Sequence, residues 1–202
     1  PRRNRHAHKG DFGHVLVVGS DIGYTGAARL AAEAAARVGA GLITIATRTS
    51  HASSIAGERA ELMCRGVESS KELRELITRA SVVAIGPGLG RGEWGRTMLE
   101  TTLEYELPLV LDADALNLLA GARAGSARWV ITPHPGEAAR LLDVSTADIQ
   151  KDRFTAIETL CQRYASNVVL KGAGTLIRGP GEVTRVCRAG NPGMGSGGMG
   201  DV

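Results

Sequence analysis

The sequence has 202 residues, 43% apolar and 22% charged, which is enough for one soluble domain with a full hydrophobic core. It contains no apolar run of membrane-spanning length, and its basic residues 1–10 lack the apolar core of a secretory signal. The net charge of +3 comes largely from those residues, and two tryptophans, three tyrosines and two phenylalanines offer little for base stacking, so nucleic-acid binding is not expected.

Domain organisation and compartment follow from simple patterns. We interpret residues 1–10 as a basic arm or linker and residues 11–202 as a single domain. The three cysteines, Cys64, Cys161 and Cys187, are widely spaced and form no CxxC pair. This argues against a disulfide framework and a structural zinc site, and it favours a cytoplasmic protein.

In chain order, short β-branched runs alternate with longer segments rich in alanine and leucine. Strands are predicted at residues 14–18, 42–46, 82–85, 129–132 and 168–170, with a hairpin pairing 175–177 and 183–186. Helices are predicted within residues 25–41, 71–79, 97–103, 138–142 and 148–164, and residues 108–120 pass from a strand into a helix. The predicted fold class is α/β, with a mostly parallel sheet covered by helices on both faces.

Five polar or glycine-rich motifs each follow a predicted strand. They are GSDIGYTG, GPGLG, DADALN, TPHPGE and KGAGT. Ligands of open α/β sheets bind beyond the carboxyl ends of the strands, so we expect the five motifs to form one large site.

The first two motifs allow different interpretations. The glycines of GSDIGYTG do not match GxGxxG, which favours a substrate-facing loop over a dinucleotide fingerprint. GPGLG can present bare backbone to a flat ring or a phosphate, or it can be an ordinary tight turn. We expect Asp112 and Asp114 to share one face of an extended segment, with Asn117 beginning the next helix. This pair can bind a metal or a ribose hydroxyl, or Asp114 can cap the helix.

The later motifs contain candidate binding residues. His134 stands between two prolines that restrain its backbone, and Glu137 follows three residues later, without the further ligands of a tight metal cage. A magnesium ion carried mainly by nucleotide phosphate fits this pair. Lys171 in KGAGT can contact a phosphate or a ribose, or it can be an ordinary solvated lysine.

The tail from residue 190 to 202 has six glycines before Asp201. Such a loop can hold phosphate through its backbone N–H groups, and the aspartate behind it can act as a base. A flexible glycine tail is the alternative, but Pro192 and the two methionines of this segment favour the phosphate cradle.

Taken in order, these motifs, ending in GNPGMGSGGMGD, resemble the ADP-dependent NAD(P)H-hydrate dehydratases of the ribokinase-like superfamily over nearly the whole chain. The match is most similar to the carboxy-terminal domain of bacterial bifunctional enzymes that also carry an NAD(P)H-hydrate epimerase domain. The resemblance implies repair of the S-epimer of hydrated NADH or NADPH at the expense of ADP, with AMP and phosphate as products. It also implies a homo-oligomer.

The resemblance assigns roles to individual residues. Asp201 would be the catalytic base and would also contact the hydrated nucleotide. Ala27, Gly88 and His134 would line that substrate, and Glu137 would contact Mg²⁺ through water. The ADP site would be formed by Lys171, Gly172, Ala173, Gly174, Thr175 and Gly200.

The chain departs from many relatives at Met199, where they have a threonine that can contact phosphate. Because the family pattern continues past GDV, we expect a domain truncated at its carboxyl end. Two alternative functions are an ATP-dependent kinase of vitamin precursors, which would use the same cradle, and a non-catalytic nucleotide-binding module. Replacement of the kinases' asparagine by His134 favours the dehydratase.

Overall fold

The computed structural model describes residues 6–122 and 125–202. Residues 1–5 of the predicted arm and residues 123–124 lie outside the described part. Arm residues 9 and 10 begin a short 3₁₀ helix, η1 (Lys9–Phe12). The backbone N–H of Gly41, just before the second strand, donates to the carbonyl of Phe12 and ties this helix to the sheet.

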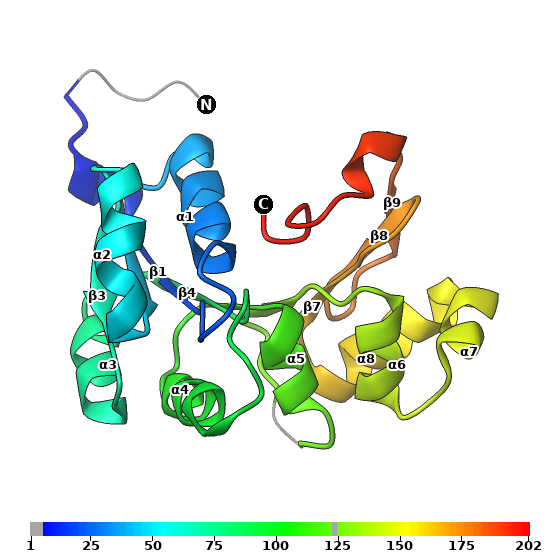
Figure 1. Cartoon of the computed structure of the whole chain (residues 1–202). Coiled ribbons are helices and arrows are strands. Elements are labelled where there is room, and N and C mark those ends of the chain that lie inside the picture. The colour runs from blue at the N-terminus through cyan, green and yellow to red at the C-terminus, as the bar shows by residue number, and fades with distance from the viewer. Residues whose placement is uncertain (1–5, 123–124) are drawn as a thin grey trace.

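Within the described residues, nine strands form one sheet in the order β3-β2-β1-β4-β5-β6-β7-β8-β9 (Figure 1). Strands β1 to β7 are parallel, and β8 and β9 extend the sheet as antiparallel strands. The strands are β1 (His14–Val18), β2 (Leu42–Thr47), β3 (Met63–Gly66), β4 (Val82–Ile85), β5 (Leu109–Leu111), β6 (Trp129–Ile131), β7 (Asn167–Leu170), β8 (Thr175–Arg178) and β9 (Arg185–Cys187).

The helices lie between these strands, as expected for βα units. They are α1 (Ala27–Val38), α2 (Thr49–Glu58), α3 (Ser70–Ile77), α4 (Glu93–Leu103), α5 (Ala113–Leu119), α6 (Pro135–Leu142), α7 (Thr146–Lys151) and α8 (Arg153–Tyr164), and a 3₁₀ turn, η2 (Pro192–Met194), lies in the tail. Local signals fix several ends. Gly39 ends α1 with a φ of 107°, and a reciprocal capping box between Ser69 and Glu72 starts α3.

Two apolar cores cover the two faces of the sheet, which confirms the predicted fold class. Side chains of β1 alternate between them, with Val17 facing α1 and α2 while Leu16 and Val18 face the core shared by α3, α4, α5, α6 and α8. Burial of each such side chain contributes about 1.5–3 kcal/mol to folding. The glycine-rich tail lies on the α1 side of the sheet and approaches α1, where a Cβ on Gly198 would lie 2.8 Å from Leu30 Cδ1 (Figure 1).

Several sequence expectations are wrong in detail. Helix α5 begins at Ala113, so Asp112 is its N-cap residue, Asp114 lies in its first turn, and Asn117 lies inside it rather than at its start. The predicted helix at 148–164 is interrupted at Asp152, whose carboxylate caps α8 through the N–H of Thr155. Helix α2 and strand β3 were not predicted.

Two further observations concern composition. The three cysteines are free thiols, and burial raises the pKa of Cys161, whose Sγ donates to the carbonyl of Ser166. Among the described residues, no helix has the length and apolar character needed to cross a membrane.

Candidate functional site

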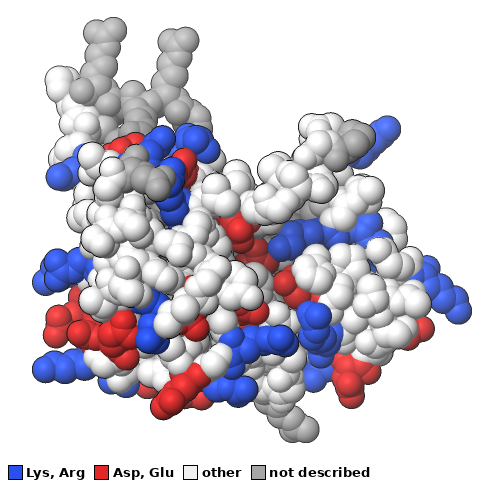
Figure 2. Space-filling model, viewed as in Figure 1, with Lys and Arg blue, Asp and Glu red and all other residues white. Residues whose placement is uncertain are grey.

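The five motifs gather at one edge of the sheet, as predicted. They follow β1, β4, β5, β6 and β7, which are neighbouring parallel strands in that order. Figure 2 shows the molecule hollowed between the α1 side and the tail, with acidic and basic atoms close together inside the hollow. The site therefore has an α1 side and a tail side, and the ends of β5 and β6 lie between them.

On the α1 side, backbone hydrogen bonds join the loop after β1 to the loop after β4. The N–H of Ser20 donates to the carbonyl of Pro87 at 3.0 Å, and that of Asp21 donates to the carbonyl of Gly88 at 2.7 Å. Gly88 has a φ of 58°, and a Cβ on it would lie 2.7 Å from Tyr24 Cβ and 3.0 Å from Ala27 Cβ. The structure thus brings Ala27 and Gly88 together and leaves no room for a side chain at position 88.

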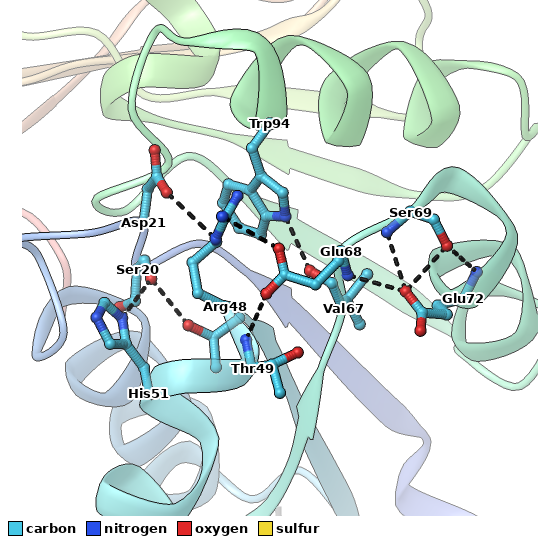
Figure 3. Close-up of polar contacts among 11 residues, drawn as sticks. Ser20, Asp21, Arg48, Thr49, His51, Val67, Glu68, Ser69, Glu72 and Trp94 are labelled. Carbon is cyan, nitrogen blue, oxygen red and sulfur yellow. Dashed lines mark hydrogen bonds and ion pairs between the residues drawn. The ribbon is translucent and has the colours of Figure 1, made fainter.

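Arg48, at the end of β2, supports this loop (Figure 3). Its guanidinium lies 3.8 Å from the Asp21 carboxylate and 3.2 Å from that of Glu68, and it stacks 5.5 Å above the centre of the Trp94 ring. The carbonyl of Ser20 accepts from Thr47 Oγ1 and faces His51 Nδ1 at 3.0 Å. These contacts hold the loop after β1 in place, and they identify Arg48 as a structural support.

The ends of β5 and β7 are joined by an ion pair between Asp112 and Lys171. Lys171 Nζ donates to Asp112 Oδ1 at 2.7 Å, and the Asp112 side chain is 10% exposed. Asp114 has a different role, because its carboxylate accepts from the N–H of Gly90 and from Asn117 Nδ2. The two aspartates are therefore not a matched pair: Asp112 faces the site, and Asp114 fixes the GPGLG loop.

His134 and Glu137 form the capping box of α6 at the end of β6. The N–H of His134 donates to Glu137 Oε2 at 2.8 Å, and the N–H of Gly136 donates to His134 Nδ1. Burial, helped by the nearby charges of Lys171 and Arg140, lowers the pKa of His134 below its ordinary 6.5, so the imidazole is neutral at pH 7. With Nδ1 accepting, the proton lies on Nε2, which is 3.4 Å from Glu137 Oε1.

Glu137 is a buried carboxyl group with an unusual titration. Its side chain is 5% exposed, and burial raises its pKa from 4.5 to about 7, against the opposing effect of the His134 N–H and the Lys171 charge. No three His, Cys, Asp or Glu side chains of the described chain are grouped closely enough to hold a metal. A cation near Glu137 would therefore need most of its ligands from a bound molecule or from water.

On the tail side, the KGAGT loop and the tail enclose a pocket of about 680 Å³. It is lined by residues 171–175, 187–191, 194–195 and 199–200. All six residues predicted for the ADP site are among them. Residues 187–189, which precede the predicted cradle and include Arg188, also line the pocket, and they are recognisable only once the β8–β9 hairpin places the tail opposite the loop.

Asp201 lies where the two sides meet. A Cβ on the preceding Gly200 would lie 3.5 Å from Lys171 Nζ. Burial and the neighbouring charge of Asp112 raise the pKa of Asp201 above its ordinary 3.8, while Lys171 acts in the opposite direction. A carboxylate with a raised pKa, beside an ammonium group and a nucleotide-sized pocket, has the properties of a general base in phosphoryl transfer.

Comparison with known proteins agrees with this arrangement. The family model described as NAD(P)H-hydrate dehydratase matches residues 15–202. A bifunctional NAD(P)H-hydrate repair enzyme of Coxiella burnetii is 55% identical over the whole chain, which spans 41% of that protein. An ADP-dependent (S)-NAD(P)H-hydrate dehydratase of Neisseria meningitidis is 37% identical over 99% of the chain and 69% of its own length.

A solved structure of a relative has the same fold. The ADP/ATP-dependent NAD(P)H-hydrate dehydratase of Bacillus subtilis, co-crystallized with ATP and Mg²⁺, superposes with a TM-score of 0.87. It is 29% identical and aligns with 100% of this chain and 73% of its own. With a family match over most of its length and a site formed by the same strand ends that the sequence predicts, this chain belongs to the NAD(P)H-hydrate dehydratase family.

Proposed function

We propose that this protein dehydrates the S-epimer of hydrated NADH or NADPH at the expense of ADP, releasing NAD(P)H, AMP and phosphate. The observation that carries the proposal is the tail-side pocket, which is lined by Lys171 and by Gly200, the residue before Asp201, while the tail approaches α1 at Leu30. A nucleotide in the pocket would direct its terminal phosphate toward a substrate held on the α1 side.

The chemistry needs a better leaving group than hydroxide. Asp201 takes the proton from the ring hydroxyl of the hydrate, and the oxygen attacks the β-phosphorus of ADP while the bond to AMP breaks. The phosphorylated hydroxyl then leaves as phosphate, pushed by the electron pair of the ring nitrogen, and loss of a proton from the neighbouring carbon restores the double bond. The raised pKa of Asp201 supports its role, because a carboxylate with a higher pKa is a stronger base.

Lys171 serves both steps as a fixed positive charge. Its ammonium group is held at 2.7 Å from Asp112 and lies close to Gly200, so it would face the phosphate as negative charge moves from one oxygen to another. On the opposite side, Ala27 and Gly88 would let the hydrated ring approach the backbone closely. His134, with its side chain 51% exposed and neutral, can donate a hydrogen bond to that substrate from Nε2.

Magnesium fits the donor set only as an indirectly held ion. Both Glu137 oxygens already face His134 groups, so a water-mediated contact suits the carboxylate better than direct ligation. Mg²⁺ would neutralise phosphate charge during transfer. Glu137 would hold one of its water ligands, and the cation would in turn favour the charged form of this carboxyl group.

The direct test is recovery of reduced-nicotinamide absorbance after the protein is mixed with chemically hydrated NADH, ADP and Mg²⁺. We expect recovery that depends on ADP and yields one AMP per NADH. Recovery without ADP, or none in a preparation shown to bind both ligands, would contradict the proposal. Phosphorylation of a vitamin-precursor alcohol by ATP under the same conditions would favour the kinase instead.

We also propose that the protein works in the cytoplasm. We further propose that it acts together with an NAD(P)H-hydrate epimerase activity, because its relatives include bifunctional repair enzymes. The reaction as written consumes one epimer. With a mixture of epimers, we expect fast recovery to stop at the S fraction and to reach completion when an epimerase is added. Completion at the same rate without epimerase would refute the stereochemical part of the proposal.

A further inference from the structure

Arg153, the first residue of α8, reaches under the KGAGT loop and donates to three backbone carbonyls, one at the end of β7 and two in the loop. Its Nη1 lies 2.8 Å from the carbonyl oxygen of Ala173, and its Nη2 lies 3.2 Å from that of Leu170 and 3.3 Å from that of Lys171. One guanidinium group thus holds most of the turn between β7 and β8. No motif in the sequence singles it out, because the contacts join residues 17 to 20 positions apart.

These contacts set the direction of the loop's N–H groups. A trans peptide is planar, with its N–H pointing opposite to its C=O. When the carbonyls of Lys171 and Ala173 face Arg153, the N–H groups of Gly172 and Gly174 must face away from it. Both glycines line the tail-side pocket, and neither N–H has an acceptor within the described residues.

The backbone of the loop is shaped to fit the guanidinium group. Gly172 has a φ of 143°, and a Cβ on it would lie 3.0 Å from Arg153 Nη2. Arg153 Nε is buried and has no partner among the described residues, an unfavourable arrangement for a residue that serves stability alone. Asp152, which caps α8, fixes the helix end from which Arg153 extends.

We propose that Arg153 is a positioning residue for ADP: it holds the carbonyls of the loop away from the pocket so that the N–H groups of Gly172 and Gly174 bind the diphosphate. The inference rests on the proposed function of the pocket. Successive backbone N–H groups turned to one side form an anion-binding concavity, and a cation behind them adds favourable potential. Arg153 itself acts through the loop.

The test compares Arg153→Lys and Arg153→Gln with Arg163→Lys, an exposed arginine at the other end of the same helix. Lysine keeps the charge, but its single nitrogen cannot take the place of the two guanidinium nitrogens that contact the carbonyls. We expect both Arg153 variants to bind ADP about tenfold or more weakly by calorimetry, with KM for ADP raised and KM for hydrated NADH changed by less than about twofold. Arg163→Lys should match the wild type in every measurement.

Gly172→Ala tests the same contact from the loop side and leaves α8 unchanged. Its methyl group would press on the guanidinium and alanine is strained at the φ of 143° found there, so we expect a similar loss of ADP affinity; Gly181→Ala, with a φ of 75° and open space around it, is the control for backbone strain alone. Wild-type affinity in both Arg153→Lys and Gly172→Ala would overturn the inference. Equal losses for ADP and for hydrated NADH would also overturn it, by showing general damage. Absence of ADP binding in the wild type would instead refute the proposed function.

Discussion

Replacement of Glu137 by glutamine should reduce the loss of folding stability that the protein suffers as the pH becomes alkaline. The glutamate has a pKa of about 7 in the folded protein, compared with an ordinary 4.5. Because the folded-state pKa is raised, the folded protein is favoured most when the group is protonated. Stability is therefore greatest below the unfolded-state pKa and falls as the pH rises from 4.5 through 7.

The magnitude follows from the same two values. With both forms of the group counted in the folded and unfolded states, wild-type stability should fall by roughly 2 to 3 kcal/mol between about pH 5 and about pH 8 because of Glu137 alone. Glutamine keeps the capping box, since its oxygen can accept from the N–H of His134, but it carries no titratable proton. The stability of Glu137→Gln relative to the wild type should thus rise by that amount.

Urea unfolding at the two pH values, without nucleotide or Mg²⁺, measures this difference. Glu75→Gln, which replaces an exposed glutamate of α3, controls for the loss of one negative charge. If the difference between Glu137→Gln and the wild type is the same at both pH values, the carboxyl group is not protonated in the folded protein and the reasoning fails.

Three further substitutions test the site. Asp201→Asn should keep ADP affinity but lose at least about a hundredfold in kcat, as expected for removal of a general base, and turnover near the wild-type rate would exclude Asp201 as the base. Asp112→Asn should move the acid limb of the pH–kcat profile to lower pH, because Asp112 raises the pKa of Asp201; an unmoved or higher limb would contradict this coupling. Gly88→Ala should push the GPGLG loop away from Tyr24 and Ala27, at a cost of about 1–3 kcal/mol of overpacking. We expect KM for hydrated NADH to rise about tenfold while KM for ADP stays the same, and equal changes in both KM values would show general damage.

The sequence predicted the site best where chain direction alone decides the geometry. The five motifs meet because β1, β4, β5, β6 and β7 are parallel neighbours; their common direction follows from the alternation of strands and helices, whereas the strand order comes from the structure. The tail-side pocket was likewise predictable from KGAGT and the terminal glycines. The roles of individual residues in catalysis remain predictions.

Features that depend on tertiary contacts were not predictable. Strand β3 is short, lies at the sheet edge and has no fully buried residue, so its four residues give little apolar signal. The Asp112–Lys171 ion pair joins residues 59 positions apart, and the pKa of Glu137 depends on burial that no local pattern encodes. The prediction that Asp114 lies in an extended segment was wrong, because α5 starts at Ala113, directly after Asp112.

The pairing of β6 with β7 is the seam between the two sides of the site in the sheet. Their ladder registers only Val130 with Asn167 and Ile131 with Val168, and the strands that carry the nucleotide loop and the tail all lie beyond it. Local opening at this seam would part the two ligands, and it would also loosen the apolar core that packs against the sheet on both sides of it. Ligands that together span the seam suppress such opening, so ADP and the hydrated nucleotide should each strengthen the binding of the other beyond what their direct contact contributes.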